Sequence, residues 1–520
     1  MGLSESHERE VTAGHSLNSG ETDHVTSRRE TVVHCLKLHD ISCTEDVVPN
    51  IAVLGSGGGL RAMVALLGSL CQLDKEGLLD CIMYLSGVSG STWCMASLYK
   101  EPDWSTQLQA VTDGIVERLV NGEVTIMEKI NKLVQYSKYD NFSLTHVWAV
   151  FLSGIVKELD EQVLNEQKDE DSEDDGKEYS DDHSEDPYPI YTVIDKQCKN
   201  QKLHKDVWFE ITPHEAGYSL TGAFVDSSWF GSEFNKGKRH EEKSCPSIDM
   251  LYLQGLCGSA LAKRAVIVYW ILDWLRDLLT CKKFDDTGVY PGICILEGLI
   301  TQKEAEEFTL PVCNSYLQWF QGCDVLIGVA KALKLTLSWT WGTTYNFLDE
   351  MTVKDVDPSV LKSTKREYED AGLLLNSPYF SVLRKERKID LIISLDFSED
   401  DNHFKTLDAA AEKCKEAEID FPDVSHMHDR EPLDFYVFKG NENAPTVIHI
   451  PLFNAINCPG EVEAWRRNFS TTTLHYTAEM ITDLIEKAEL NIRNNKEKLL
   501  REIKNIIEQK QKTKGTKKEK

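Results

Sequence analysis

The chain has 520 residues, 41% of them hydrophobic, and its 85 acidic and 57 basic side chains give a formal net charge of -28. This charge argues against nucleic-acid binding, which needs a basic face, and it weakens long-range attraction to anionic membranes. The length predicts two domains, or one α/β domain with large insertions. The 14 cysteines form no C-x-x-C pair, so we interpret them as reduced thiols rather than as disulfides or zinc ligands.

The first 34 residues are polar and are expected to be disordered. They contain no apolar stretch typical of a signal peptide. The opening Met1-Gly2-Leu3-Ser4-Glu5-Ser6 fits the loose N-myristoylation pattern, which short sequences often match by chance.

A glycine loop follows the first clear strand. Ile51-Ala52-Val53-Leu54 predicts a buried strand, Gly55-Ser56-Gly57-Gly58-Gly59 a loop, and the segment from Leu60 to about Leu79 a helix. Glycines at a helix start expose backbone N–H groups that can hold an oxyanion during acyl transfer. A nucleotide-phosphate loop fits poorly, because G-x-G-x-x-G would need glycine at position 60 and no Gly-Lys-Ser/Thr follows. A simple tight turn is the remaining alternative.

A second glycine loop lies about thirty residues further on. Gly87-Val88-Ser89-Gly90-Ser91 separates the apolar run 81–85 from a helix-compatible segment that starts at Thr92. A serine between glycines, after a strand and before a helix, is typical of a nucleophile elbow. The strict G-x-S-x-G pattern is not met, since Ser91 replaces its second glycine. The two loops together favour a catalytic Ser89 more strongly than either loop alone.

Arg61 opens the helix after the first glycine loop. A guanidinium there could grip a substrate phosphate with the bidentate geometry that lysine lacks. The alternative is an ordinary solvated surface arginine.

The middle of the chain contains two segments expected to be insertions. Residues 158–187 are strongly acidic and predict a solvated, disordered loop. A calcium loop starting at Asp171 is a weaker alternative, because it lacks the terminal glutamate and flanking amphipathic helices. Residues 280–335 are less patterned and are expected to form a lid or cap. The apolar stretch 265–279 is too short and too interrupted by charge to span a bilayer.

Later segments complete the α/β pattern. His214 follows a proline in an aromatic context and is interpreted as a structural hydrogen-bonding residue rather than a triad member. Ile389-Asp390-Leu391-Ile392-Ile393-Ser394-Leu395 predicts another buried strand. Residues 478–507 repeat apolar side chains at helical spacing, and a lysine-rich tail, residues 510–520, follows.

Several motifs together resemble the cytosolic phospholipase A2 family, whose catalytic domain is patatin-like. These motifs are the two glycine loops and, further on, Thr212-Pro213-His214, Gly222-Ala223-Phe224, Trp341-Gly342-Thr343-Thr344-Tyr345-Asn346-Phe347, Asp370-Ala371-Gly372 and Asp390-Leu391-Ile392-Ile393-Ser394-Leu395-Asp396-Phe397-Ser398. They occur in order between about residues 35 and 495, which the resemblance makes the catalytic domain, leaving 496–520 as a helical to basic tail. The resemblance is greatest to the gamma-type branch without the N-terminal calcium-binding β-sandwich, since about fifty residues precede the first loop. It implies an α/β fold with a central, largely parallel sheet flanked by helices, plus insertions that form a cap or lid.

The resemblance also implies the site. A serine–aspartate dyad without histidine falls on Ser89 and Asp370, and oxyanion-hole amides fall on Gly58 and Gly59. Phosphate-binding arginines fall on Arg61 and Arg387, and no metal or cofactor is implied. Only the resemblance selects Asp370 from so many carboxylates, because Asp-x-Gly by itself is a common turn.

Two departures from the family pattern are visible. The segment after the aspartate, Asn376-Ser377-Pro378-Tyr379-Phe380, lacks a second proline, and we expect little effect on the chemistry. The chain ends Lys517-Lys518-Glu519-Lys520 without a prenylated cysteine box, so we expect no prenyl anchor.

The expected function is calcium-independent phospholipase A2 and lysophospholipase activity through an acyl-serine intermediate, with water or a lysolipid as acyl acceptor. The substrates would be membrane glycerophospholipids and lysophospholipids, with no nucleic acid and no obligate protein partner. The expected location is the cytoplasm, with peripheral attachment to intracellular membranes. The alternatives are an esterase or acyltransferase that uses another acyl donor at the same site, and a lipid-binding scaffold that retains the fold without turnover.

Overall fold

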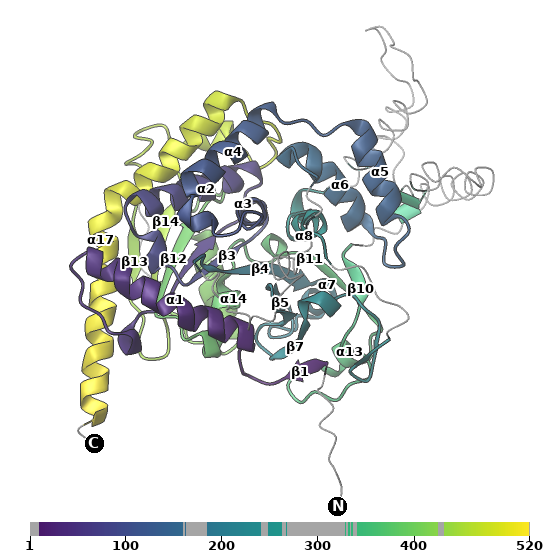
Figure 1. Ribbon diagram of the computed structural model, residues 1–520, viewed down its shortest axis with the longest axis horizontal. Helices are drawn as coiled ribbons and strands as arrows, with labels where there is room; N and C mark the ends of the chain where they lie inside the picture. Colours follow the sequence, from purple (N-terminus) through teal and green to yellow (C-terminus); the bar gives the residue numbers. More distant parts are fainter. Residues whose placement is uncertain are drawn as a thin grey trace, which may run out of the picture.

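The computed structural model describes residues 10–159, 162, 185–240, 248–262, 341–424 and 431–518, together with the isolated positions 267, 328, 331, 332, 334 and 335. Its centre is one twelve-stranded sheet covered by helices (Figure 1). The strands of this sheet are β1 Val11–Ala13, β2 Ile51–Gly55, β3 Tyr84–Gly87, β4 Tyr188–Asp195, β5 Trp208–Ile211, β6 Glu215–Tyr218, β7 Ala223–Asp226, β10 Thr343–Tyr345, β11 Lys365–Asp370, β12 Leu391–Asp396, β13 Tyr436–Phe438 and β14 Thr446–Pro451. Strands β8 (Phe234–Asn235) and β9 (Lys238–Arg239) form a separate hairpin.

The described helices surround this sheet. They are α1 Ser19–Leu38, α2 Leu60–Lys75, α3 Gly90–Leu98, α4 Leu108–Asn121, α5 Ile126–Tyr136, α6 Leu144–Val156, α7 Lys196–Gln201, α8 Met250–Cys257, α13 Pro358–Leu361, α14 Tyr379–Val382, α15 Lys405–Glu416, α16 Val462–Asn468 and α17 Ala478–Lys518. The helix predicted to reach about Leu79 ends at Lys75, because Gly77 adopts a left-handed φ of 67°.

The centre of the sheet is parallel, as expected, and both flanks are antiparallel. Strands β14, β12, β2, β3 and β4 pair side by side in parallel. Every residue of these five strands is buried, which explains their continuous apolar runs. On the flanks, β5, β6, β7 and β1 follow β4 in antiparallel order, and β13 pairs antiparallel with β14.

The register of the parallel strands brings the two glycine loops together. Gly55, the last residue of β2, pairs with Gly87, the last residue of β3. On its other side Gly55 pairs with Leu395 of β12. The chain therefore leaves all three strands at one edge of the sheet, and the loops that follow must lie side by side.

The long strand β4 positions a third segment, the end of β11, next to the two glycine loops. Its Tyr191 pairs with Gly87 of β3, and its Val193 pairs with Asp370 of β11, which runs antiparallel. Strand β5 occupies the opposite edge of β4, where it pairs with both Tyr191 and Val193. Strands β3 and β11 therefore share one edge of β4 and end close to each other.

The N-terminal segment differs from the expectation of disorder over residues 1–34. Within that range, β1 adds to the sheet beside β7 and α1 packs on the body of the protein. Helix α1 buries two charged residues, Glu21 and Arg28, together with apolar side chains. Because these charges find buried partners, a segment of polar composition is part of the fold.

The C-terminal helix also differs from the expected boundary at residue 495. Helix α17 continues without a break from Ala478 to Lys518, and it packs along α2 (Figure 1). Leu499, Ile503 and Ile507 are buried beyond the expected boundary, so this part of the helix belongs to the core. The acidic insertion lies almost entirely outside the described residues, as does nearly all of the lid segment 280–335.

Candidate active site

Ser89 occupies a strained turn between β3 and α3. It is the N-cap of α3 with φ 53° and ψ -120°, and it is 5% exposed. Residues other than glycine rarely adopt a positive φ, and such strain concentrates at functional sites. The turn places the Ser89 hydroxyl at the N-terminus of α3, where the helix dipole favours negative charge.

Asp370 ends β11 and is fully buried. Its carboxylate accepts hydrogen bonds from two main-chain amides, Ala260 N at 3.0 Å and Gly372 N at 2.8 Å, and the side chain of Ser89 interacts with the same carboxylate. Burial raises the pKa of Asp370 to about 6, and the two amides together with Ser89 limit the rise. Ser89 therefore lies beside a buried carboxylate, and an ionised carboxylate next to a serine hydroxyl can accept its proton.

The first glycine loop packs directly on the Ser89 turn. A Cβ on Gly90 would lie 1.9 Å from the carbonyl oxygen of Gly59, so only glycine permits this approach. Gly59 has a φ of 60° and precedes the first turn of α2. In the part of the chain that the structure describes, the N–H groups of Gly58 and Gly59 have no recorded hydrogen-bond acceptor. They are therefore available to an oxygen bound beside Ser89.

Arg61 packs against this loop, and only 1% of its surface is exposed. Its Nε donates to Phe397 O at 2.8 Å, its Nη1 donates to Phe469 O, and its Nη2 donates to Thr471 Oγ1 at 2.9 Å. Nη1 also lies 3.6 Å from a carboxylate oxygen of Glu399. Arg61 thus joins the start of α2 to two distant segments, and most of its donors already have protein acceptors.

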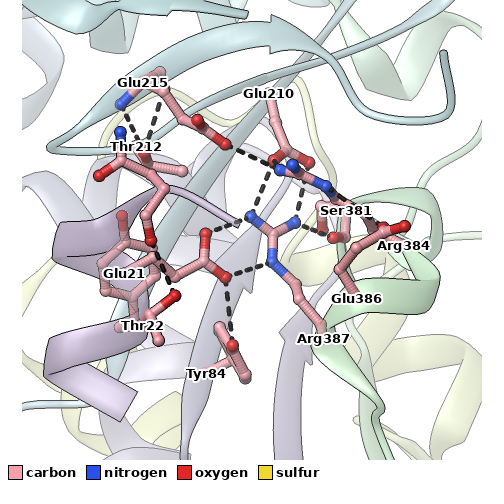
Figure 2. A network of polar contacts seen from close by, with 12 residues as sticks. Glu21, Thr22, Tyr84, Glu210, Thr212, Glu215, Ser381, Arg384, Glu386 and Arg387 are labelled. Atoms are coloured by element: carbon pink, nitrogen blue, oxygen red, sulfur yellow. Dashed lines mark hydrogen bonds and ion pairs between the residues drawn. The ribbon is translucent and has the colours of Figure 1, made fainter. Parts of the chain in front are cut away.

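Arg387 lies in a different place, within the buried charge network of Figure 2. Its five N–H groups are all donated, to both carboxylate oxygens of Glu21, both of Glu210, and the carbonyl of Ser381. Neither Ser89 nor Asp370 is among its partners. The structure therefore corrects the phosphate-binding expectation for Arg387, because no donor remains for a phosphate. Its contacts instead fasten α1 to the sheet.

His214 is also placed by the structure. Its Nδ1 lies 2.8 Å from the hydroxyl of Tyr188, and the two rings stack at 5.7 Å. These contacts agree with its interpretation as a structural histidine.

Three residues that support the site were not predicted as site residues from the sequence. Ala260 supplies an amide to Asp370, and Ser259 Oγ accepts the Asp370 N–H at 3.0 Å. Asn376 binds the first glycine loop, as developed below. Each acts across more than a hundred residues of sequence, so spacing could not reveal it.

Among the described residues, no three His, Cys, Asp or Glu side chains are arranged to bind a metal ion. None of the described helices is both long enough and apolar enough to cross a bilayer.

The chain is similar to proteins of known family. A family model described as the lysophospholipase catalytic domain matches residues 51–264, which include both glycine loops. Human cytosolic phospholipase A2 gamma is 33% identical over 96% of this chain and 96% of its own length. The mouse protein of the same name is 31% identical over 94% of this chain and 91% of its own length.

The solved structure of human GIVD cytosolic phospholipase A2 shares the fold. The TM-score is 0.71 at 23% identity, over 97% of this chain and 69% of that chain. The chain belongs to the cytosolic phospholipase A2 family.

Proposed function

We propose that this protein is a calcium-independent phospholipase A2 and lysophospholipase that cleaves acyl esters of glycerophospholipids with Ser89 and Asp370. The observation that carries the proposal is the juxtaposition of the strained Ser89, at the end of β3, with the buried Asp370 carboxylate, at the end of β11. Esterase chemistry of this substrate class is what the named relatives perform. Asp370, rather than a histidine, serves as the base.

The first half of the reaction acylates the enzyme. Ser89 Oγ attacks the ester carbonyl carbon while Asp370 takes the hydroxyl proton, and the carbonyl oxygen becomes an oxyanion held by the Gly58 and Gly59 amides. Collapse of this intermediate breaks the bond to the glycerol oxygen, which takes the proton from Asp370 and leaves as lysophospholipid. The acyl group stays on Ser89 as an ester.

The second half releases the acyl group. Water attacks the acyl-serine and gives a proton to Asp370, and a second oxyanion forms at the same amides. Its collapse returns the proton to Ser89 and frees the fatty acid. A lysophospholipid hydroxyl in place of water would give transacylation by the same steps. Carboxylate, serine and amides suffice for this scheme, so calcium has no role in it.

In this scheme Arg61 stabilises the structure of the site and does not bind the substrate phosphate. Its hydrogen bonds to Phe397 O and Phe469 O fix the start of α2, which directly follows the glycine loop. These contacts occupy most of the Arg61 donors, which favours a supporting role over bidentate phosphate binding. Glycerophospholipid substrates lie in membranes, and the relatives are named cytosolic phospholipases A2. Both points favour action at the cytosolic surface of membranes, with peripheral attachment.

The test is active-site labelling. A lipid-like fluorophosphonate should phosphonylate Ser89 of the purified protein, with the adduct located by mass spectrometry of the peptide. Ser89→Ala should lose both labelling and hydrolysis of phospholipid vesicles in the presence of EGTA. Ser97→Ala is the matched control, because Ser97 lies on the same helix and its hydroxyl contacts Arg118. Labelling at another residue, or hydrolysis by Ser89→Ala, would refute the assignment.

A further inference from the structure

Asn376 forms two hydrogen bonds with the main chain of Gly57. The carbonyl of Asn376 accepts the Gly57 N–H at 3.1 Å, and its side-chain Nδ2 donates to the Gly57 carbonyl at 3.1 Å. One residue, 319 positions away in sequence, therefore satisfies both main-chain groups of Gly57. The second of these bonds depends on the side chain and can be removed by substitution.

The side-chain bond has a consequence for the next residue. The Gly57 carbonyl and the Gly58 N–H belong to one planar, trans peptide unit, so they point in opposite directions. Fixing the carbonyl on Asn376 Nδ2 fixes the plane of this unit and therefore the direction of the Gly58 N–H. Within the residues that the structure describes, that N–H has no hydrogen-bond acceptor.

Gly57 is also tightly packed against Asn376 and Ser89. A Cβ built on Gly57 would lie 2.4 Å from Asn376 Oδ1 and 3.0 Å from Ser89 Cβ. Asn376 Oδ1 would also lie 3.1 Å from a Cβ on Gly372, whose N–H binds Asp370. Asn376 thus touches the glycine loop and the aspartate turn at once.

We infer that Asn376 is a positioning residue that aims the Gly58 N–H at the oxyanion by holding the Gly57 carbonyl. This inference rests on the proposed function, since it assigns the Gly58 amide to the oxyanion. Asn376 acts through the peptide and takes no part in bond making. Its contribution is to keep the donor oriented before the charge develops.

The variant Asn376→Asp separates this role from packing, because it keeps the side-chain size and removes the donor. Losing one oxyanion donor typically lowers kcat by about 100-fold to 1,000-fold. Partial misalignment should give a loss of at least about tenfold in kcat with KM within about threefold of wild type. Fluorophosphonate labelling of Ser89 should slow by a similar factor, because phosphonylation develops charge on an oxygen at the same place. Asn376→Ala, which adds no charge, should show the same pattern.

Asn346→Asp is the matched control. Asn346 is a buried asparagine whose Nδ2 likewise donates to main-chain carbonyls, Val360 O at 2.7 Å and Ser363 O at 2.6 Å. Its replacement should lower the thermal midpoint without changing kcat per folded molecule. A wild-type labelling rate in Asn376→Asp, or an activity loss that only follows its unfolded fraction, would overturn the inference and leave the proposed function intact. Failure of the wild-type Ser89 to label would instead refute the proposed function.

Discussion

Substitution of Arg61 distinguishes a supporting role from phosphate recognition. Arg61→Met keeps a long side chain but removes every N–H donor. The carbonyls of Phe397 and Phe469 would then lose their guanidinium partner in a buried environment. The glycine loop would lose its support in the same step, because the Arg61 Nη2 lies against Gly58.

The size of the effect follows from these contacts. A buried carbonyl left without a donor costs about 1–3 kcal/mol, so two of them predict a loss of about 2–6 kcal/mol in the free energy of unfolding. A supporting role further predicts that kcat falls by the same factor for a phospholipid and for a phosphate-free aryl ester. A role confined to phosphate binding predicts about a hundredfold loss for the phospholipid alone, with little loss of stability.

The assay compares kcat/KM on both substrates with the urea midpoint of each variant. Arg28→Met is the matched control, because Arg28 is also fully buried and also donates to main-chain carbonyls, including Ile82 O at 2.7 Å. It should lose stability comparably while activity per folded molecule is retained. A selective loss on phospholipid in Arg61→Met, at unchanged stability, would refute the supporting role and restore the phosphate role.

Three further predictions follow from charge and composition. Because burial raises the pKa of Asp370 to about 6, and the base must be ionised, kcat/KM should fall about tenfold per pH unit below that value; an acid limb near pH 4 would contradict a base whose pKa is raised by burial. In the network of Figure 2, burial raises the pKa of Glu215 from 4.5 to about 7, so its ionisation destabilises the fold increasingly as the pH rises through this range. Glu215→Gln keeps an acceptor for Arg384 and should gain up to about 3 kcal/mol over wild type at pH 8 but little at pH 4.5, measured by urea unfolding; an equal difference at both pH values would contradict this reasoning. Deletion of residues 168–184, which retains the buried Asp186 and its hydrogen bond from Ser105 N, should leave kcat on phospholipid unchanged with and without calcium, because a segment of such acidic composition adds little to a core; a calcium-dependent loss of activity would revive the calcium-loop interpretation.

The sequence alone was most informative where local chemistry constrains the chain. Glycines between an apolar run and a helix predicted both loops, because few other residues tolerate such turns and exposed amides. Ser89 stood out for the same reason. Apolar runs predicted the buried strands β2, β3 and β12, and apolar residues at helical spacing predicted the C-terminal helix.

Only the tertiary structure decided what depends on burial and on long-range pairing. Asp370 is one acidic residue among 85, and its raised pKa exists only because β4 pairs with both β3 and β11 and buries it beside Ser89. Glu21 lies in a polar N-terminal segment, yet it is buried because Arg387 neutralises it across 366 positions. The same pairing leaves Arg387 without a donor for phosphate. The groups that surround a charged residue decide whether it is a solvated surface residue, a structural partner or a base. Those groups come from distant parts of the chain.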